Sequence, residues 1–322
     1  MNPYIGQESQ LYGIEEHRLV EGKGDGMRLL QIRNGKGLEM TVSLDRCADI
    51  SRLSIDGMNV SYFSPCGYVA PAYYQKDGDN WLKSFTAGFL TTCGLESVGN
   101  PCVDQGETLS LHGAIGNTPA EHAWWYEEGN SLVVRAKVRD EVLFGRKFLL
   151  DREIRISLEE NVFTIHDTVE NTSDRVQPME ILYHMNMGYP MLDEDSVVSI
   201  PADSVSPRDN HAAEDVQNCL TMEKPQEGYQ ERCYYHHFSG KEGFASIYQP
   251  KRNKGLAISF DTAQLDCFVE WKMMGKRDYV LGLEPGNCFP DGRNVMREKG
   301  ILKFLEPGAK QSFGIQIRFF EN

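Results

Sequence analysis

The stretch MRLLQIRNGKGLEMTVSLDRCADISRLSIDGMNVSYFS, residues 27 to 64, decides the fold class. Apolar and polar residues alternate along it, which is the pattern of strands with one buried face. Asn34-Gly35 and Asp56-Gly57 interrupt the alternation, and both pairs are typical of tight hairpin turns. The stretch therefore predicts three or four short antiparallel strands joined by hairpins.

The same pattern continues through the rest of the chain. Residues 131–174 alternate in the same way. Shorter strand candidates follow at residues 179–188, 196–200, 243–249, 255–260, 266–273, 278–284, 300–305 and 311–320. Helical patterns are confined to short stretches around 8–13 and 81–87, and strands do not alternate with helices. We predict an all-β protein, a large antiparallel β-sandwich with one or two short helices, in a single domain over residues 1–322.

Charge argues against several classes of partner. The chain carries 47 acidic and 33 basic side chains, a formal net charge of −14, so it repels nucleic acid and anionic membranes. It begins without the basic and apolar segments of a signal peptide, and no apolar run is long enough to span a bilayer. We expect a cytoplasmic protein with a small neutral or cationic partner, no nucleic acid and no membrane. A homodimer is one possibility for its oligomeric state.

Eight cysteines are scattered along the chain without a Cys-x-x-Cys pair. This spacing favours neither a zinc ribbon nor a dense disulfide scaffold. In a cytoplasmic protein we expect most of them to be buried free thiols.

The segment LGLEPGNCFPDGR, residues 281 to 293, places Glu284 where an apolar strand meets a turn. Pro285 restricts the backbone directly after it, and Gly286 follows. A glutamate at a strand end is usually a solvated surface group. Rigid positions on a β scaffold are also where functional side chains concentrate, so Glu284 is a candidate for catalysis.

His184 lies in the apolar segment MEILYHMNMGYPML, residues 179 to 192. Asn186 follows two residues later, so a strand would place both side chains on one face. A histidine in such a segment is more often a hydrogen-bonded core residue than a catalyst. A buried polar pair needs partners, however, and a bound ligand is one way to supply them.

A third candidate, His112, lies in LSLHGAIGNTPAEH, residues 109 to 122, ahead of a glycine-rich turn that contains Asn117. Its distance from His122 matches no metal-binding spacing, and the chain has no His-x-His or His-Glu-x-x-His motif. We therefore expect no metal site and no cofactor.

Three further positions carry weaker signals. Arg46 in SLDRCADISRL can contact a ligand, although an inter-strand ion pair is its commoner role. Trp271 in CFVEWKMM can form an aromatic platform for a sugar ring, although a strand tryptophan is usually a core residue. The adjacent pair His236-His237 would face opposite sides of a strand, which argues against a shared site.

Three of these segments resemble the galactose mutarotase (aldose 1-epimerase) superfamily. LGLEPGNCFPDGR resembles the segment with the family's catalytic glutamate, ILYHMNMGYP the strand with its catalytic histidine, and LSLHGAIGN its Leu-His-Gly segment with a substrate-binding histidine. They occur in the family's order along the chain. The family's Asn-Arg motif is replaced by LTTCGLESVGNP, residues 90 to 101, which is typical of a divergent branch.

The resemblance implies a β-supersandwich fold and an enzyme that interconverts the α and β anomers of a sugar by ring opening. It implies that Glu284 takes the proton of the anomeric hydroxyl, His184 donates one to the ring oxygen and His112 binds the substrate. One acid and one base suffice for this reaction. The further candidates for contact with the sugar are Arg46, Asn186, Trp271 and Asn117.

Two other functions remain open from the sequence. One is a carbohydrate-binding or sensing protein on the same fold, which would need neither an acid nor a base. The other is a metal-dependent sugar isomerase on a cupin-like barrel, which needs the His-x-His cluster that the sequence lacks. The identity of the sugar depends on a few hydrogen bonds from loops, and the sequence does not place those loops.

Overall fold

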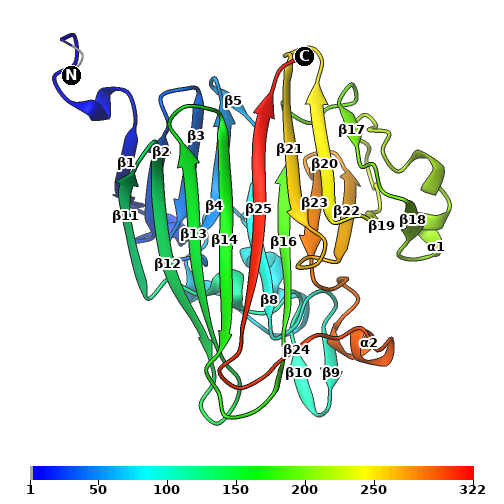
Figure 1. Cartoon of the computed structure of the whole chain (residues 1–322). Helices are drawn as coiled ribbons and strands as arrows, with labels where there is room; N and C mark the ends of the chain where they lie inside the picture. Colours follow the sequence, from blue (N-terminus) through cyan, green and yellow to red (C-terminus); the bar gives the residue numbers. More distant parts are fainter. Residues whose placement is uncertain (1–2) are drawn as a thin grey trace.

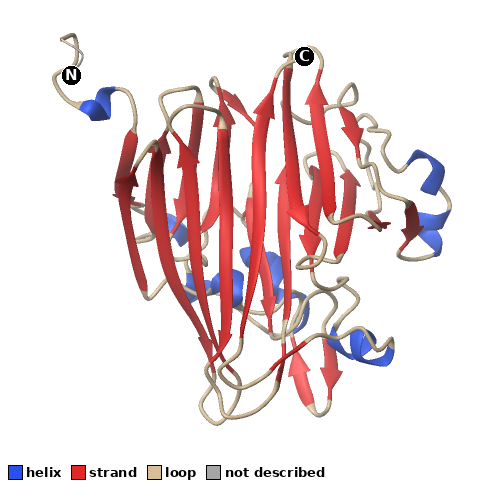
Figure 2. Ribbon diagram, in the orientation of Figure 1, coloured by secondary structure: helices blue, strands red, loops and turns tan. Residues whose placement is uncertain are grey.

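Most of the strands lie in three large antiparallel sheets (Figure 1). The computed structural model describes residues 3–322, so Met1 and Asn2, which the predicted domain includes, lie outside the described residues. Figure 2 shows long strands and connecting loops with only short helical segments between them. The predicted all-β antiparallel sandwich is confirmed.

An eight-stranded sheet forms one layer of the sandwich and faces the viewer in Figure 1. Its strands, in spatial order, are β11 (His122–Glu128), β12 (Ser131–Glu141), β13 (Lys147–Ser157), β14 (Val162–Asn171), β25 (Lys310–Phe320), β21 (Lys254–Asp261), β20 (Glu242–Gln249) and β17 (Val197–Ser199). Every second residue of β13 from Phe148 to Ile156 is buried, so the sheet has one core face and one exposed polar face.

Two smaller sheets form the opposite layer, behind the first in Figure 1. The five-stranded sheet consists of β1 (Gly13–Arg18), β2 (Arg28–Arg33), β3 (Leu38–Ser43), β4 (Asp49–Ile55) and β5 (Met58–Asn59). The six-stranded sheet consists, in spatial order, of β18 (Ser204–Pro207), β19 (Arg232–His237), β22 (Cys267–Met274), β23 (Tyr279–Gly286), β16 (Glu180–Met187) and β8 (Leu90–Leu95). The turns predicted at Asn34-Gly35 and Asp56-Gly57 connect β2 to β3 and β4 to β5.

Short elements complete the fold. Three two-stranded ladders are β6 (Tyr62–Phe63) with β7 (Ala87–Gly88), β9 (Cys102–Asp104) with β10 (Glu107–Leu109), and β15 (Gln177–Pro178) with β24 (Phe304–Leu305). The described helices are α1 (Asn210–Ala213), α2 (Arg293–Glu298) and the 3-10 helices η1 (Glu8–Gln10), η2 (Gly22–Gly24), η3 (Pro71–Tyr73), η4 (Gly78–Ser84), η5 (Ile115–Asn117) and η6 (Val216–Asn218). Within residues 3–322, none of the helices has the length and apolar character that crossing a bilayer requires.

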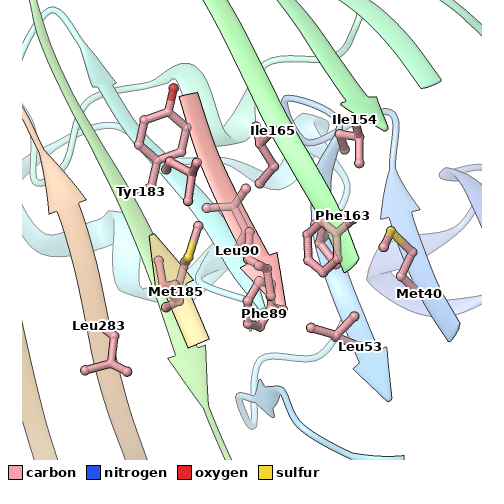
Figure 3. Close-up of a cluster of buried hydrophobic side chains, with 14 of the residues drawn as sticks. Met40, Leu53, Phe89, Leu90, Ile154, Phe163, Ile165, Tyr183, Met185 and Leu283 are labelled. Atoms are coloured by element: carbon pink, nitrogen blue, oxygen red, sulfur yellow. The ribbon is translucent and has the colours of Figure 1, made fainter. Parts of the chain in front are cut away.

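The main hydrophobic core lies between the layers and takes residues from all three sheets. Figure 3 shows side chains of the five-, eight- and six-stranded sheets in one cluster, among them Met40, Leu53, Ile154, Phe163, Tyr183 and Leu283. In β16 the odd-numbered residues from Ile181 to Met187 all belong to this core. The even-numbered residues of β16 therefore point to the other face of the six-stranded sheet.

A buried ion network crosses this core. The guanidinium of Arg152, on β13, lies 2.6 Å from a carboxylate oxygen of Asp49 and 2.6 Å from one of Asp167, and it donates to the hydroxyl of Thr92. Tyr183 donates to Asp167 over 2.8 Å. These residues belong to β4, β8, β13, β14 and β16, so one guanidinium connects the three sheets. Buried charges of this kind are tolerated because each one is paired and hydrogen-bonded.

The structure corrects parts of the strand and helix prediction. The helix predicted around 8–13 is limited to η1, and β1 already begins at Gly13. The helix predicted at 81–87 begins earlier, at Gly78, and Ala87 belongs to β7. β8 lies outside the predicted strands because it is buried along its whole length and so shows no alternation. All eight cysteines are free and six are buried, as predicted.

Candidate active site

His184 and Glu284 lie side by side on neighbouring strands of the six-stranded sheet, on the face directed away from the main core. β16 and β23 are antiparallel, with Leu182 opposite Gly286 and Asn186 opposite Gly282. This register sets His184 opposite Glu284, and His184 Nδ1 lies 3.1 Å from Glu284 Oε1. One strand pair thus brings together two residues that are 100 positions apart in the sequence (284 − 184).

Glu284 belongs to a strand and not to a turn. β23 runs through Pro285 to Gly286, so the turn predicted directly after Glu284 is wrong. Pro285 has no N–H to donate, and the pairing of β16 with β23 is interrupted at Tyr183 and His184. On its other side β23 pairs with β22 without interruption. The carboxylate is therefore positioned by a sheet, which is more rigid than a loop.

Gly282 creates the space that the Glu284 carboxylate occupies. A Cβ atom at position 282 would lie 2.2 Å from Glu284 Oε1 and 3.0 Å from the Cβ of Trp271. The first distance is far below any real contact, so a side chain here would displace the carboxylate. A residue without a side chain, two positions before Glu284 on the same face of the strand, is thus a requirement of the site.

The pair lines a pocket of about 420 Å³ with aromatic walls. The His184 ring centroid lies 5.1 Å from that of Trp271 and 5.3 Å from that of Phe85, and Phe85 stacks on Trp81 at 4.6 Å. Trp81 comes from η4, so the helical stretch forms one wall of the pocket. The volume and the aromatic surfaces suit a small ligand that has an apolar face.

His112 lines the same pocket, next to His184. The two ring centroids lie 5.8 Å apart, and the His112 ring lies 4.8 Å from that of Trp81. The sequence predicts a strand end here, but His112 occupies a turn between β10 and η5 with a left-handed backbone (φ 56°). Gly113 follows with φ 69°, and a Cβ there would lie 2.2 Å from the carbonyl oxygen of Gly94. This tight turn directs the imidazole into the pocket.

Burial opposes charge on Glu284, His184 and His112. It raises the pKa of Glu284 well above its usual range; the Glu231 carboxylate adds to this and Arg208 opposes it. Burial lowers the pKa of His184 well below its usual range, with a smaller contribution from His112. Burial and Arg208 lower the pKa of His112 to about 4, so this ring is neutral at pH 7. Burial therefore favours the neutral form of each of these three side chains.

Within residues 3–322, His184 Nδ1 and Glu284 Oε1 face each other at 3.1 Å and neither has another hydrogen-bond partner. His112 Nδ1 has no partner among these residues. Buried polar atoms normally find partners, and an unpaired one destabilises the fold. The three atoms belong to residues that line one pocket, so the site concentrates polar side chains whose hydrogen-bonding capacity is not used up within the protein.

Arg208 and Glu231 also line the pocket, although no sequence pattern indicates them. Arg208 Nη2 lies 3.1 Å from Glu231 Oε1, and Trp271 Nε1 donates to Glu231 Oε2 over 2.8 Å. One carboxylate thus fixes both the arginine and the tryptophan. Arg208 follows β18 and Glu231 precedes β19, so they meet because these two strands pair. That pairing is a long-range event with no local signature.

The structure brings His112 and Trp271 to the pocket but not Arg46, Asn186 or Asn117. Arg46 donates to the carbonyl groups of Gly116 and Val69, so its guanidinium braces two loops instead of facing the ligand space. Asn186 lies on the same face of β16 as His184, but its side chain is fully buried and donates to the backbone carbonyl of His184. The side chain of Asn117 is buried in η5. The positions of these three residues therefore do not support the predicted contacts with a ligand.

Comparisons with known proteins agree with this architecture. A family model described as a domain of unknown function, DUF4432, matches residues 24–319. The chain matches no curated protein. A solved structure from Klebsiella pneumoniae, described as that of a candidate aldose 1-epimerase, is 27% identical, with a TM-score of 0.91 over 98% of this chain and 86% of that chain.

Two other solved structures share the fold at lower identity. A galactose 1-epimerase from Lactobacillus acidophilus is 15% identical, with a TM-score of 0.66 over 97% of this chain and 99% of that chain. A galactose mutarotase-like protein from Clostridium acetobutylicum is 14% identical, with a TM-score of 0.67 over 97% and 100% of the two chains.

Proposed function

The chain belongs to the DUF4432 family and has the galactose mutarotase-like fold, and on this basis we propose that it is an aldose 1-epimerase that acts on an uncharged sugar. The observation that carries the proposal is the approach of His184 Nδ1 to Glu284 Oε1, 3.1 Å apart, in a pocket with aromatic walls. The description of the Klebsiella pneumoniae protein supports it. A protein that only binds a sugar needs no acid and base in contact.

The proposed reaction uses the pair in its ionised form. Glu284 takes the proton of the anomeric hydroxyl while protonated His184 donates a proton to the ring oxygen, and the bond between the anomeric carbon and the ring oxygen breaks. The open-chain aldehyde rotates about the bond between carbons 1 and 2, and the ring closes with both transfers reversed. Because burial favours the neutral forms of both residues, it favours the neutral pair that ring opening produces. The neutral ring of His112 would orient the sugar by hydrogen bonding.

The charges around the pocket support an uncharged substrate. Asp79, Glu231 and Glu284 line it, and Arg208 is the sole Lys or Arg side chain of residues 3–322 that does. Arg208 is already paired with Glu231 at 3.1 Å and with Asp209 at 3.2 Å. A carboxylate or phosphate on the sugar would therefore meet acidic groups without a free cation.

Arg293, which lies nine residues after Glu284 in the sequence, adds no positive charge to the pocket. Its guanidinium bonds to the carboxylates of Asp104 and Glu107 and to the carbonyl of Glu96. It fastens α2 to the β9–β10 hairpin and is not available to a ligand.

Polarimetry tests the proposed activity directly. We expect the protein to speed the approach to equilibrium of a freshly dissolved α-anomer of at least one neutral hexose, pentose or deoxy sugar. Uronic acids and sugar phosphates serve as negative controls. We expect no acceleration with them, because the pocket offers their negative charge no free cation. Saturable binding of a neutral sugar without any acceleration across the panel would contradict catalysis and indicate a binding protein.

Gly282→Ala should lower the activity by about 100-fold while the fold survives. The new Cβ would displace the flexible end of Glu284, and a shift of about 1 Å in a catalytic group has an effect of this size. Gly314→Ala in β25 is the matched control, because its Cβ would lie 3.2 Å from the ring of His166, outside the pocket. The measurement is kcat/KM by polarimetry together with the thermal midpoint. Equal activity of the two variants would show that the position of the carboxylate is not critical.

A further inference from the structure

One group of three potential metal ligands occurs in the part of the chain that the structure describes, and it lies behind the pocket. Cys219, His236 and Glu270 each place one ligand atom within 4.8 Å of the other two. His236 Nε2 lies 2.9 Å from Glu270 Oε2. Val269 and Trp271 line the pocket, so Glu270 between them points to the opposite face of the six-stranded sheet.

The fold builds this cluster from two strands and a covering segment. β19 and β22 pair with Tyr234 opposite Glu270, so His236 and Glu270 are diagonal neighbours on one face. Cys219 directly follows η6, in the segment that covers this face, and it packs with Ala212 and Tyr234. All three potential ligands are more than nine-tenths buried.

Lys272 holds the covering segment in place. Its ammonium donates to the carbonyl of Thr221 over 2.6 Å and to that of Asn218 over 3.4 Å, and it lies 3.2 Å from Glu223 Oε1. These carbonyls flank Cys219 along the chain, so the ammonium fixes the backbone that presents the thiol. Its charge is met by Glu223 and by these two carbonyl dipoles, and it also attracts the carboxylate of Glu270 on the same strand.

The two oxygens of the Glu270 carboxylate have different surroundings. Within residues 3–322, Oε1 makes no hydrogen bond although the side chain is fully buried, whereas Oε2 lies against His236. A carboxylate oxygen left unpaired in the interior is strongly unfavourable. This carboxylate interacts with the thiol of Cys219 and lies against the imidazole of His236, so three groups that can bind a metal ion surround one point.

We propose that Cys219, His236 and Glu270 bind one zinc-class divalent cation. Thiolate, imidazole and carboxylate are the ligand types that zinc uses, at bond lengths of about 2.0–2.3 Å. Tetrahedral geometry with such bonds sets ligand atoms roughly 3.5 Å apart, which lies between the 2.9 Å and 4.8 Å of the cluster. Cys219 releases its thiol proton to solvent on binding, and water takes the fourth position.

The site is structural and independent of the proposed sugar chemistry. The cation would tie the segment after α1 to β19 and β22, directly behind the pocket residues Cys233 and Trp271. The sequence prediction of no metal site rests on spacing. Ligands at positions 219, 236 and 270 follow no known motif, so that prediction had no means of finding them.

Cobalt titration of the chelator-treated full-length protein tests the proposal. We expect one equivalent of Co²⁺ to bind with a near-ultraviolet thiolate charge-transfer band, and Zn²⁺ to displace it and raise the thermal midpoint. Cys219→Ser should lose the band, and His236→Gln should weaken binding by at least about 100-fold. The matched controls are His237→Gln and Cys66→Ser, whose side chains lie outside the cluster and should leave binding unchanged.

Alkylation of the wild-type protein keeps the proposal testable if a cluster variant does not fold. In urea below the unfolding midpoint, where the buried thiol of Cys219 is transiently exposed, we expect one equivalent of Zn²⁺ to protect Cys219 from a thiol reagent, read by mass spectrometry, and to leave the modification of Cys66 and Cys102 unchanged. The proposal is overturned if the wild-type protein fails to bind one equivalent of either metal. It is equally overturned if folded Cys219→Ser keeps the cobalt band, or if Zn²⁺ leaves Cys219 as reactive as before.

Discussion

We expect Glu284→Gln to lower kcat/KM for the proposed mutarotation by about 10³-fold, the loss that follows the removal of a general base. Glutamine has the shape of glutamate but cannot accept the proton of the anomeric hydroxyl, and His184 keeps its place on β16. Anomer exchange measured by polarimetry or by NMR gives the rate. Glu306→Gln, at an exposed position away from the pocket, is the control and should keep full activity.

The same substitution should make the protein more stable at neutral pH. Burial raises the pKa of Glu284, so the folded state holds this proton more tightly than the unfolded chain, and stability is lost as pH rises from about 4.3 through the folded pKa. Glutamine removes that loss. We expect a gain of about 1 kcal/mol in the free energy of unfolding at pH 7 and almost none at pH 4.

These two readouts separate catalysis from folding. A variant that is inactive and yet more stable supports a catalytic carboxylate, whereas an inactive and unstable variant would point to a structural one. Mutarotation at the wild-type rate in Glu284→Gln removes Glu284 from the proposed mechanism, whatever the thermal midpoint shows.

Arg152→Leu is expected to destabilise the fold by about 3–5 kcal/mol, the effect of removing one partner from a buried ion network. Asp49 and Asp167 would keep their places in the core without the guanidinium that neutralises them. Burial already raises the pKa of Asp49, and Arg152 opposes that rise. Without Arg152 the pKa rises further, so the destabilisation should be larger at pH 7 than at pH 5. Urea denaturation at both pH values measures it.

Arg155→Leu is the matched control on the same strand. Arg155 pairs with Glu128 and Glu153 on the outer, partly exposed side of β13, where an ion pair contributes less than about 1 kcal/mol. Changing Asp49 and Asp167 to asparagine together with Arg152→Leu should recover part of the lost stability, because no uncompensated charge remains. Equal losses in Arg152→Leu and Arg155→Leu would show that the network does not hold the sheets together.

Local patterns determine which parts of this fold are predictable from the sequence. Strands with one polar face, such as β13, are predictable because apolar and polar residues alternate along them. The hairpin turns at Asn34-Gly35 and Asp56-Gly57 are predictable from their residue types. β8 has no polar face and lacks that signal. Pro285 reads as a turn, yet it lies within β23, because tertiary pairing on the β22 side overrides the local preference.

The candidate site divides in the same way. His184, Glu284 and His112 lie in segments that resemble a known family, and the structure places all three in one pocket. Arg208 and Glu231 reach it through the pairing of β18 with β19. The Cys219 cluster, behind the pocket, likewise depends on a segment that covers β19 and β22. Such contacts depend on which distant strands meet. Arg46 shows the reverse case: it lies in the turn between β3 and β4, not in a strand, and its guanidinium donates to carbonyl groups of two loops.

The alternation along β16 and β23 has an evolutionary consequence. Tyr183 and Met185 of β16, and Leu283 of β23, pack in the main core, while His184 and Glu284 face the pocket. Selection can therefore act on the two sets separately: substitutions around the pocket change which molecule fits, and the packing that drives folding stays as it was. A scaffold arranged in this way can diverge in substrate while keeping its architecture, which agrees with a fold shared across 14% to 27% identity.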